Sequence, residues 1–234
     1  MNIELDEKQL CRMFDHTQLK AYASEADFIK LCREAKELNV AMVAINGAPV
    51  ELCKALLQGT GIHVGAAISF PLGQCTLETK LFEAADAINR GADEIDYVIN
   101  IGQLKSGHWD YIRLEMMKMV ELCHSRNKIC KVIFENCYLE KEEIRKLAQI
   151  AREVKPDYIK TSTGFGVSGA RVEDVRLMKE TVGDAVKVKA AGGIRDWPTC
   201  KAMIEAGAQR IGTSSSLAIL EGFRKEKNYE NADL

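Results

Sequence analysis

Short apolar runs alternate with helix-like segments along almost the whole chain. Each run precedes apolar residues at helical spacing, a pattern typical of a strand followed by a helix. The runs that we expect to form strands cover residues 12–17, 40–45, 63–70, 94–99, 129–134, 158–160, 185–189 and 209–212. The run from Val40 to Ile45 is continuously apolar, as strands buried on both faces of a parallel sheet usually are. This alternation favours an α/β fold.

The number of strand–helix units predicts a closed barrel. Eight units of about 30 residues each fit a single (β/α)8 TIM barrel, a fold of about 250 residues, and the chain has 234. A short N-terminal helix from Asp6 to about Cys11 precedes the first unit. The alternative is a doubly wound open sheet, which usually has fewer strands and a G-x-G-x-x-G motif after the first one; that motif is missing. We expect one barrel domain over residues 1–223 and a polar, mobile tail over residues 224–234.

Charge and cysteine spacing exclude several functional classes. The chain has 32 Lys and Arg against 34 Asp and Glu, which argues against a nucleic-acid partner. No apolar stretch reaches the roughly 20 residues that span a bilayer, and the N-terminus does not resemble a signal peptide. The eight cysteines contain no Cys-x-x-Cys pair. We therefore expect reduced thiols, no metal site, no membrane partner and a cytoplasmic location.

A lysine closes the sixth expected strand. Lys160 follows the apolar pair Tyr158-Ile159 and precedes Thr161-Ser-Thr-Gly164. Burying a lysine costs several kcal/mol unless it is paired or its pKa falls. A lowered pKa is what a Schiff-base lysine needs, because only the free amine attacks a carbonyl. The alternative is a side chain that extends to water at the strand end.

Polar residues also end the other expected strands. In a barrel these ends face the same side of the molecule and hold the chemistry. The strand-end residues are Asp15, Thr17, Asn46, Asp96, Asn100, Glu135, Asn136, Lys160 and Lys189. A second ammonium near Lys160 would lower its pKa, and a carboxylate could move protons. A purely structural Asp96–lysine ion pair is the equally weighted alternative.

The seventh strand offers two lysines for this second charge. Lys187 and Lys189 share a face of the strand, with Lys187 one layer deeper or in solvent at the bottom of the barrel. We favour Lys189 because it precedes the Gly192-Gly193 turn at the expected mouth.

Three turns rich in small residues follow strands six to eight. They are Thr163–Gly166, Gly192-Gly193 and Gly212–Ser215. Small residues allow backbone N–H groups and a helix N-terminus to meet an anion, and barrels often bind phosphate in the last of these loops. The turns predict a phosphorylated substrate.

These stretches together resemble the deoxyribose-phosphate aldolases, which are Schiff-base (class I) aldolases. The resemblance runs from about Phe14 to Phe223. The matching segments are Asp15–Lys20, Phe70–Gly73, Gly91–Asp96 with Val98–Gly102, Lys160–Phe165, Val188–Arg195 and Arg210–Ser215. The resemblance implies reversible cleavage of 2-deoxy-D-ribose 5-phosphate to D-glyceraldehyde 3-phosphate and acetaldehyde, with no metal or organic cofactor. It also suggests a homodimer.

The resemblance implies roles for individual residues. Lys160 corresponds to the Schiff-base lysine, Lys189 to the lysine that perturbs it, and Asp96 to the proton-relay aspartate. The implied phosphate-binding residues are Gly164, Gly192, Gly193, Gly212, Ser214 and Ser215. Asp15 and Thr17 correspond to residues near the sugar hydroxyls, and we add Asn46 and Thr163 as substrate-binding candidates from their places at a strand end and in a turn.

The chain departs from the family pattern at a few positions. Relatives often have cysteine at the position of Ala44, proline at Gly47 and threonine at Asn136. Selectivity could differ there, so a related Schiff-base aldolase for another phosphorylated aldehyde or ketone stays open, as does a non-catalytic sugar-phosphate-binding barrel. Tyr229 in the tail could enter the pocket as a proton shuttle, although a solvated side chain is the simpler expectation.

Overall fold

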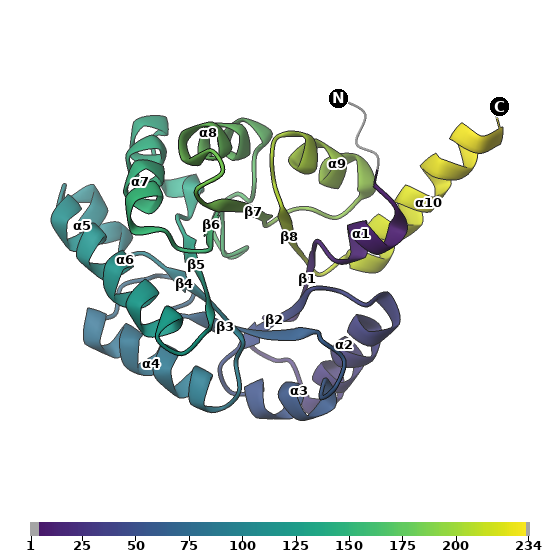
Figure 1. Ribbon diagram of the computed structural model, residues 1–234, viewed down its shortest axis with the longest axis horizontal. Helices are drawn as coiled ribbons and strands as arrows, with labels where there is room; N and C mark the ends of the chain where they lie inside the picture. The colour runs from purple at the N-terminus through teal and green to yellow at the C-terminus, as the bar shows by residue number, and fades with distance from the viewer. Residues whose placement is uncertain (1–4, 233–234) are drawn as a thin grey trace.

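The strands form a closed parallel barrel. The computed structural model describes residues 5–232, with residues 229–232 described by their backbone alone. Each strand pairs with the next, and β8 pairs with β1, so the barrel order is the chain order (Figure 1). The strands are β1 (Phe14–Thr17), β2 (Met42–Asn46), β3 (His63–Ile68), β4 (Glu94–Val98), β5 (Ile129–Ile133), β6 (Tyr158–Lys160), β7 (Lys187–Ala191) and β8 (Arg210–Thr213). The predicted (β/α)8 barrel is confirmed, and the open sheet is excluded.

Helices surround the barrel (Figure 1). They are α1 (Glu7–Cys11), α2 (Glu25–Leu38), α3 (Val50–Leu56), α4 (Leu77–Asn89), α5 (Ile101–Lys105), α6 (Trp109–His124), α7 (Lys141–Val154), α8 (Val172–Val182), α9 (Trp197–Glu205) and α10 (Ser216–Ala232), with a 3-10 turn η1 (Asn136–Tyr138). The sequence analysis did not predict α5 or η1, because such short elements show no helical period. The Asn100 side chain caps α5 by accepting from the backbone N–H of Gln103.

The two faces of the barrel carry different side chains. Outward-facing residues such as Val43, Ile95 and Ile211 are fully buried against the helices and form one continuous apolar core. The barrel interior also contains ionised side chains, including Asp15, Asp96 and Lys189. Strand alternation separates the two sets, since successive side chains point to opposite faces.

The C-terminal segment differs from the expected tail. The chain remains helical from Arg224 to Ala232 as the end of α10. Two contacts of α10 explain this: Arg224 pairs with Glu7 of α1 at 2.6 Å, and Lys225 pairs with Glu221 one turn earlier at 2.7 Å. The mobility expected for residues 224–234 stays a prediction, and the Tyr229 side chain lies outside the described residues. Within residues 5–232 no helix combines the length and apolar character needed to cross a bilayer.

Candidate active site

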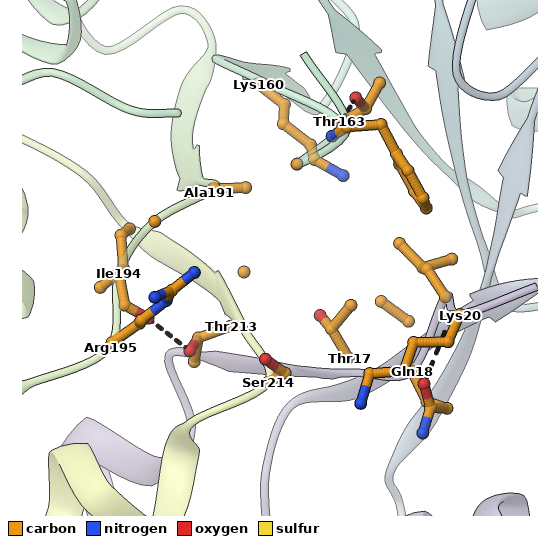
Figure 2. A pocket seen from close by; sticks show the side chains of 17 residues that line it. Thr17, Gln18, Lys20, Lys160, Thr163, Ala191, Ile194, Arg195, Thr213 and Ser214 are labelled. Atoms are coloured by element: carbon orange, nitrogen blue, oxygen red, sulfur yellow. Dashed lines mark hydrogen bonds between the residues drawn. The ribbon is translucent and has the colours of Figure 1, made fainter. Parts of the chain in front are cut away.

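A cavity of about 270 Å³ opens at the carboxyl ends of the strands. Figure 2 shows Lys160 and Thr163 across this cavity from Thr17 and Ser214, with Arg195 to one side. Of the residues predicted to form the site, those that line the cavity are Thr17, Lys160, Thr163, Gly164, Gly192, Gly193, Gly212 and Ser214.

Lys160 lies in the cavity wall although only 3% of it is exposed. Its Nζ donates to Oδ2 of Asp96 at 2.9 Å and lies 5.2 Å from the centre of the Phe70 ring. Burial lowers the pKa of Lys160 to about 8; Asp96 opposes this shift, while the ammonium groups of Lys189 and Lys131 add to it. A substantial share of free amine therefore exists near neutral pH, unlike for an ordinary lysine.

Asp96 joins three lysines. Its Oδ2 accepts from Lys160 and from Lys189 Nζ at 2.6 Å, and its Oδ1 accepts from Lys131 Nζ at 2.7 Å. Burial by itself would raise the pKa of Asp96, but the ammonium groups of Lys131, Lys160 and Lys189 outweigh burial and hold the pKa well below its ordinary value. Asp96 is therefore ionised, and the predicted grouping of Lys160, Lys189 and Asp96 exists in the structure.

The sequence analysis missed the lower layer of this ionic cluster. Lys131 is fully buried and contacts Glu94 as well as Asp96. Arg210 pairs with Asp15 at 2.7 Å and lies 3.5 Å from Glu94. Charged residues at inward positions of β4, β5 and β8 are the sequence signal for this layer, and they lie below the strand ends where the site was expected.

The charge balance of the cluster favours the loss of one proton. Four cations (Lys131, Lys160, Lys189 and Arg210) share the interior with three anions (Asp15, Glu94 and Asp96). Releasing one proton brings the buried cluster to neutrality, which reduces the desolvation cost. Lys131 keeps its proton, since the carboxylates of Asp96, Glu94 and Asp15 outweigh its burial and raise its pKa.

Two predicted residues lie below the cavity and not on its wall. Asp15 is fully buried, with its carboxylate paired to Arg210 and to Lys189 at 2.5 Å. Lys189 is likewise fully buried beneath the cavity. Both lie one inward position before a residue that does line the cavity, Thr17 in β1 and Ala191 in β7. Asp15 therefore belongs to the ionic cluster, and its role in substrate binding stays a prediction.

Other predicted residues also lie off the cavity. The Asn46 amide donates to the carbonyl of Leu19 at 3.4 Å, and the backbone N–H of Ser215 donates to Oγ1 of Thr213 at 2.9 Å. Neither residue lines the cavity. Lys187 is exposed, and its Nζ lies 5.6 Å from the centre of the Tyr158 ring. Lys189, and not Lys187, therefore reaches Asp96.

The three small-residue turns meet on one side of the cavity. Gly164, Gly192 and Gly193 have φ values of 96°, 88° and 78°, a region that favours glycine. The backbone N–H groups of Gly164, Gly193 and Ser214 donate to no other group within the described residues. Unpaired N–H groups at such turns suit a phosphate.

Arg195 adds a cation to this part of the cavity. Its exposed side chain lines the cavity next to the Gly192-Gly193 turn, and it forms no ion pair within the described residues. The sequence analysis quoted Arg195 in a motif without giving it a role. A guanidinium beside free N–H groups suits a phosphate dianion.

Glu135 fixes the shape of the turn after β6. Its carboxylate accepts from the backbone N–H of Thr163 at 3.1 Å and from the Thr163 hydroxyl. Burial raises the pKa of Glu135, although the Thr163 hydrogen bonds and Lys160 oppose the shift. The Thr163 hydroxyl also accepts from the N–H of Phe165 at 3.0 Å. Thr163 thus lines the cavity with its hydroxyl already engaged.

The three positions that depart from the family pattern differ in whether they line the cavity. Ala44 lines the cavity, but Gly47 and Asn136 do not. The Asn136 amide lies 3.4 Å from Sδ of Met178 in α8, which points it away from the cavity. Of the three positions, Ala44 alone touches the space that a substrate would occupy.

The arrangement is suited to carbonyl chemistry on an amine. It offers a lysine with a lowered pKa, an adjacent carboxylate that contacts a second ammonium, and an anion-binding turn region across the cavity. Among residues 5–232 no group of three or more His, Cys, Asp or Glu side chains is arranged to hold a metal ion.

Comparison with known proteins agrees with this chemistry. A protein in Lactobacillus acidophilus named deoxyribose-phosphate aldolase is 57% identical over all of this chain and 98% of its own length. Another of that name, in Bacteroides thetaiotaomicron, is 52% identical over 95% of this chain and 94% of its own.

Solved structures show the same fold. The aldolase QR15 superposes with a TM-score of 0.87 at 38% identity, covering 94% of this chain and 98% of its own. A deoxyribose phosphate aldolase from Aeropyrum pernix, described as tetrameric, has a TM-score of 0.87 at 30% identity, covering 94% of this chain and 92% of its own. The model of the DeoC/LacD aldolase family matches residues 10–222, and this chain belongs to that family.

Proposed function

We propose that this chain is a class I aldolase that reversibly cleaves 2-deoxy-D-ribose 5-phosphate to D-glyceraldehyde 3-phosphate and acetaldehyde. The observation that carries the proposal is the buried Lys160, with a pKa of about 8, hydrogen-bonded to Asp96 in the wall of the cavity. Relatives of this name that are 57% and 52% identical along nearly the full chain support the same substrate.

The reaction begins when the free amine of Lys160 attacks the C1 aldehyde and water leaves, giving a protonated imine. The imine accepts the electron pair of the C2–C3 bond as that bond breaks, while the C3 hydroxyl loses its proton and becomes the carbonyl of glyceraldehyde 3-phosphate. The remaining enamine takes a proton at C2, and water then hydrolyses the acetaldehyde imine and frees Lys160.

Asp96 is the proposed proton relay in these steps. It contacts Lys160 and Lys189, so a proton can pass among the three groups, and a water can extend its reach to C2. In the synthetic direction the same relay removes a proton from the acetaldehyde imine. Lys189 supplies a positive charge that keeps Lys160 poised to lose its proton.

The substrate phosphate is proposed to bind the turns that contain Gly164, Gly192, Gly193 and Ser214. Arg195 beside these turns adds a positive charge. Anchoring the phosphate away from the reacting carbon orients the aldehyde toward Lys160, which can lower the barrier by several kcal/mol.

Borohydride trapping with acetaldehyde tests the chemistry. Intact mass and peptide mapping should show one ethyl adduct on Lys160 in the wild type and none in Lys160→Met. Lys187→Met is the matched control, because this lysine is also in the barrel wall but faces solvent at its base. An adduct on Lys189, or no adduct, would overturn the assigned roles.

Product analysis separates the proposed substrate from its alternative. Cleavage of 2-deoxy-D-ribose 5-phosphate should release acetaldehyde with a kcat/KM well above that for other phosphorylated aldehydes or ketones. A higher kcat/KM for one of those would support the related aldolase. A trapped adduct without any cleavage would support neither.

The partners and compartment extend this proposal. An oligomer is supported by the relative from Aeropyrum pernix, which is described as tetrameric; mass photometry would distinguish the expected homodimer from a tetramer. A cytoplasmic location is supported by eight free cysteines, a composition suited to a reducing compartment. Cell fractionation tests it.

A further inference from the structure

A buried chain of three side chains lies directly behind the turn after β8. His16 occupies the outward position of β1 between Asp15 and Thr17, so its ring faces the surrounding helices. Its Nε2 lies 3.0 Å from Oε2 of Glu34 in α2, and its Nδ1 lies 2.9 Å from Oγ of Ser216, the first residue of α10. His16 is 3% exposed and Ser216 is fully buried.

The partners of His16 fix its tautomer. The Glu34 carboxylate can only accept, so Nε2 of His16 carries a proton and donates to it. Burial lowers the pKa of His16, with Glu34 opposing the shift, so the ring is neutral. Nδ1 is then an acceptor, and the Ser216 hydroxyl donates to it. The direction of both hydrogen bonds is therefore set by Glu34.

These bonds hold one end of the turn that faces the cavity. Thr213 holds the other end, since its hydroxyl donates to the carbonyl of Ile194 at 2.7 Å and accepts from the N–H of Ser215 at 2.9 Å. Ser214 lies between the two anchors and lines the cavity. The turn around Ser214 and the start of α10 are therefore tied to the segment after β7 on one side and to β1 and α2 on the other.

A Glu–His–Ser series also occurs in hydrolases, but this one is not built for nucleophilic attack. Ser216 is fully buried and does not line the cavity, so no substrate can reach its hydroxyl. The three side chains therefore position the turn and do not attack the substrate.

We propose that His16, oriented by Glu34, is a positioning residue that holds Ser216 and so sets the anion-binding geometry of the Thr213–Ser215 turn. The inference deepens the proposed function and rests on it, because it assumes that the substrate phosphate binds this turn. On this proposal, recognition of the substrate phosphate depends on His16, Glu34 and Ser216, although none of these side chains lines the cavity.

Substitutions along the chain test the proposal. Ser216→Ala and His16→Leu should raise KM for 2-deoxy-D-ribose 5-phosphate about five- to twentyfold, with kcat changed less than twofold. The same variants should leave kcat/KM for unphosphorylated 2-deoxyribose unchanged. His16→Asn, whose amide oxygen can replace Nδ1 as the acceptor for Ser216, should restore part of the lost affinity.

A control variant makes the outcome specific. Ser106→Ala removes a hydroxyl at the end of α5, outside the turn after β8, where it donates to the carbonyl of Gly102 at 2.9 Å. This variant should leave KM and kcat unchanged for both the phosphorylated and the unphosphorylated substrate. Equal losses with both substrates, or an unchanged KM for the phosphorylated one, would overturn the proposal. Ser216→Ala removes a single atom, so it carries the test if His16→Leu fails to fold.

Trapping of acetaldehyde separates failure of this inference from failure of the proposed function. Acetaldehyde has no phosphate, so Lys160 should be trapped equally in the wild type and in Ser216→Ala. Normal trapping with an unchanged KM would reject the positioning role alone. Absence of trapping in the wild type would reject the aldolase chemistry on which the inference rests.

Discussion

Lys160 and Lys189 share a single oxygen atom, Oδ2 of Asp96, at 2.9 and 2.6 Å. Two ammonium groups so close together repel each other, and one carboxylate oxygen cannot fully compensate both. Of the two, Lys160 lines the cavity. The geometry therefore places the amine with the lowered pKa where a carbonyl compound can reach it.

The rate of imine formation should follow the ionisation of Lys160. With a pKa of about 8, the rate of acetaldehyde trapping should rise from pH 6 and reach half its plateau near pH 8. Lys189→Met removes an ammonium that lowers this pKa, so its half-rise should move to higher pH. Lys187→Met should keep the wild-type profile. An unchanged profile in Lys189→Met would show that Lys189 does not tune Lys160.

Replacing Lys160 should stabilise the fold at neutral pH. Its pKa is about 8 in the folded state and has the ordinary lysine value in the unfolded chain, so keeping the amine protonated costs the folded state stability. This penalty is complete below about pH 8 and disappears as pH rises toward the ordinary lysine value. Lys160→Met should therefore gain about 1–3 kcal/mol in urea titrations at pH 7 and little above pH 10. A loss of stability at pH 7 would contradict the shift.

Lys131 should be essential for stability. Its removal leaves Glu94 and Asp96 with less compensation in the barrel interior, where breaking a buried ion pair typically costs about 3–5 kcal/mol. Lys131→Met should lose stability of this order in chemical denaturation. Lys187→Met, a change of the same size at an exposed inward position, should lose less than about 1 kcal/mol. Equal losses would mean that the buried charges tolerate the deletion.

Glu135 should support phosphate binding through the Thr163 turn. Its carboxylate accepts from both the N–H and the hydroxyl of Thr163, and a glutamine keeps only one acceptor oxygen. Glu135→Gln should raise KM for the phosphorylated substrate about three- to tenfold, with trapping of acetaldehyde on Lys160 intact. Steady-state kinetics measure the first effect. Loss of trapping would instead place Glu135 in the chemistry.

Ala44 should determine sensitivity to unsaturated aldehydes. It lines the cavity, where a cysteine would present a soft nucleophile to crotonaldehyde. Ala44→Cys should lose activity during exposure to crotonaldehyde faster than the wild type and gain one adduct at position 44 by peptide mapping. Ala41→Cys, at a buried site off the cavity, should behave like the wild type. Unchanged sensitivity in Ala44→Cys would contradict this role.

The place of Lys160 could be predicted because this lysine ends β6, and Asp96 and Lys189 reach it from inward positions two residues before the ends of β4 and β7. A strand that ends in a charged residue places that residue at a known edge of the barrel, and all parallel strands end at the same edge. The glycine turns were predictable for a similar reason, since each follows its strand directly. The alternation of strands and helices predicts the fold but no residue roles. The roles came from the resemblance of the motifs to those of the aldolase family.

The place of Asp15 one layer below the cavity could not be read from the sequence, because layers depend on how neighbouring strands are staggered. Register between strands is a property of the closed barrel, set by its tilt and shear, and no single strand encodes it. Lys131 and Arg210 were missed because they lie inside β5 and at the start of β8, below the strand ends where the site was expected.

The sequence alone determined the eight strand–helix units, the barrel and the lysine at its mouth, because strand alternation, helical period and turn residues act over a few neighbouring positions. Only the tertiary structure decided that Lys131 lies beneath Asp96 and that His16 meets Ser216, a residue 200 positions away. Such contacts form between side chains from distant segments, and their geometry depends on how the barrel closes and how the helices pack around it.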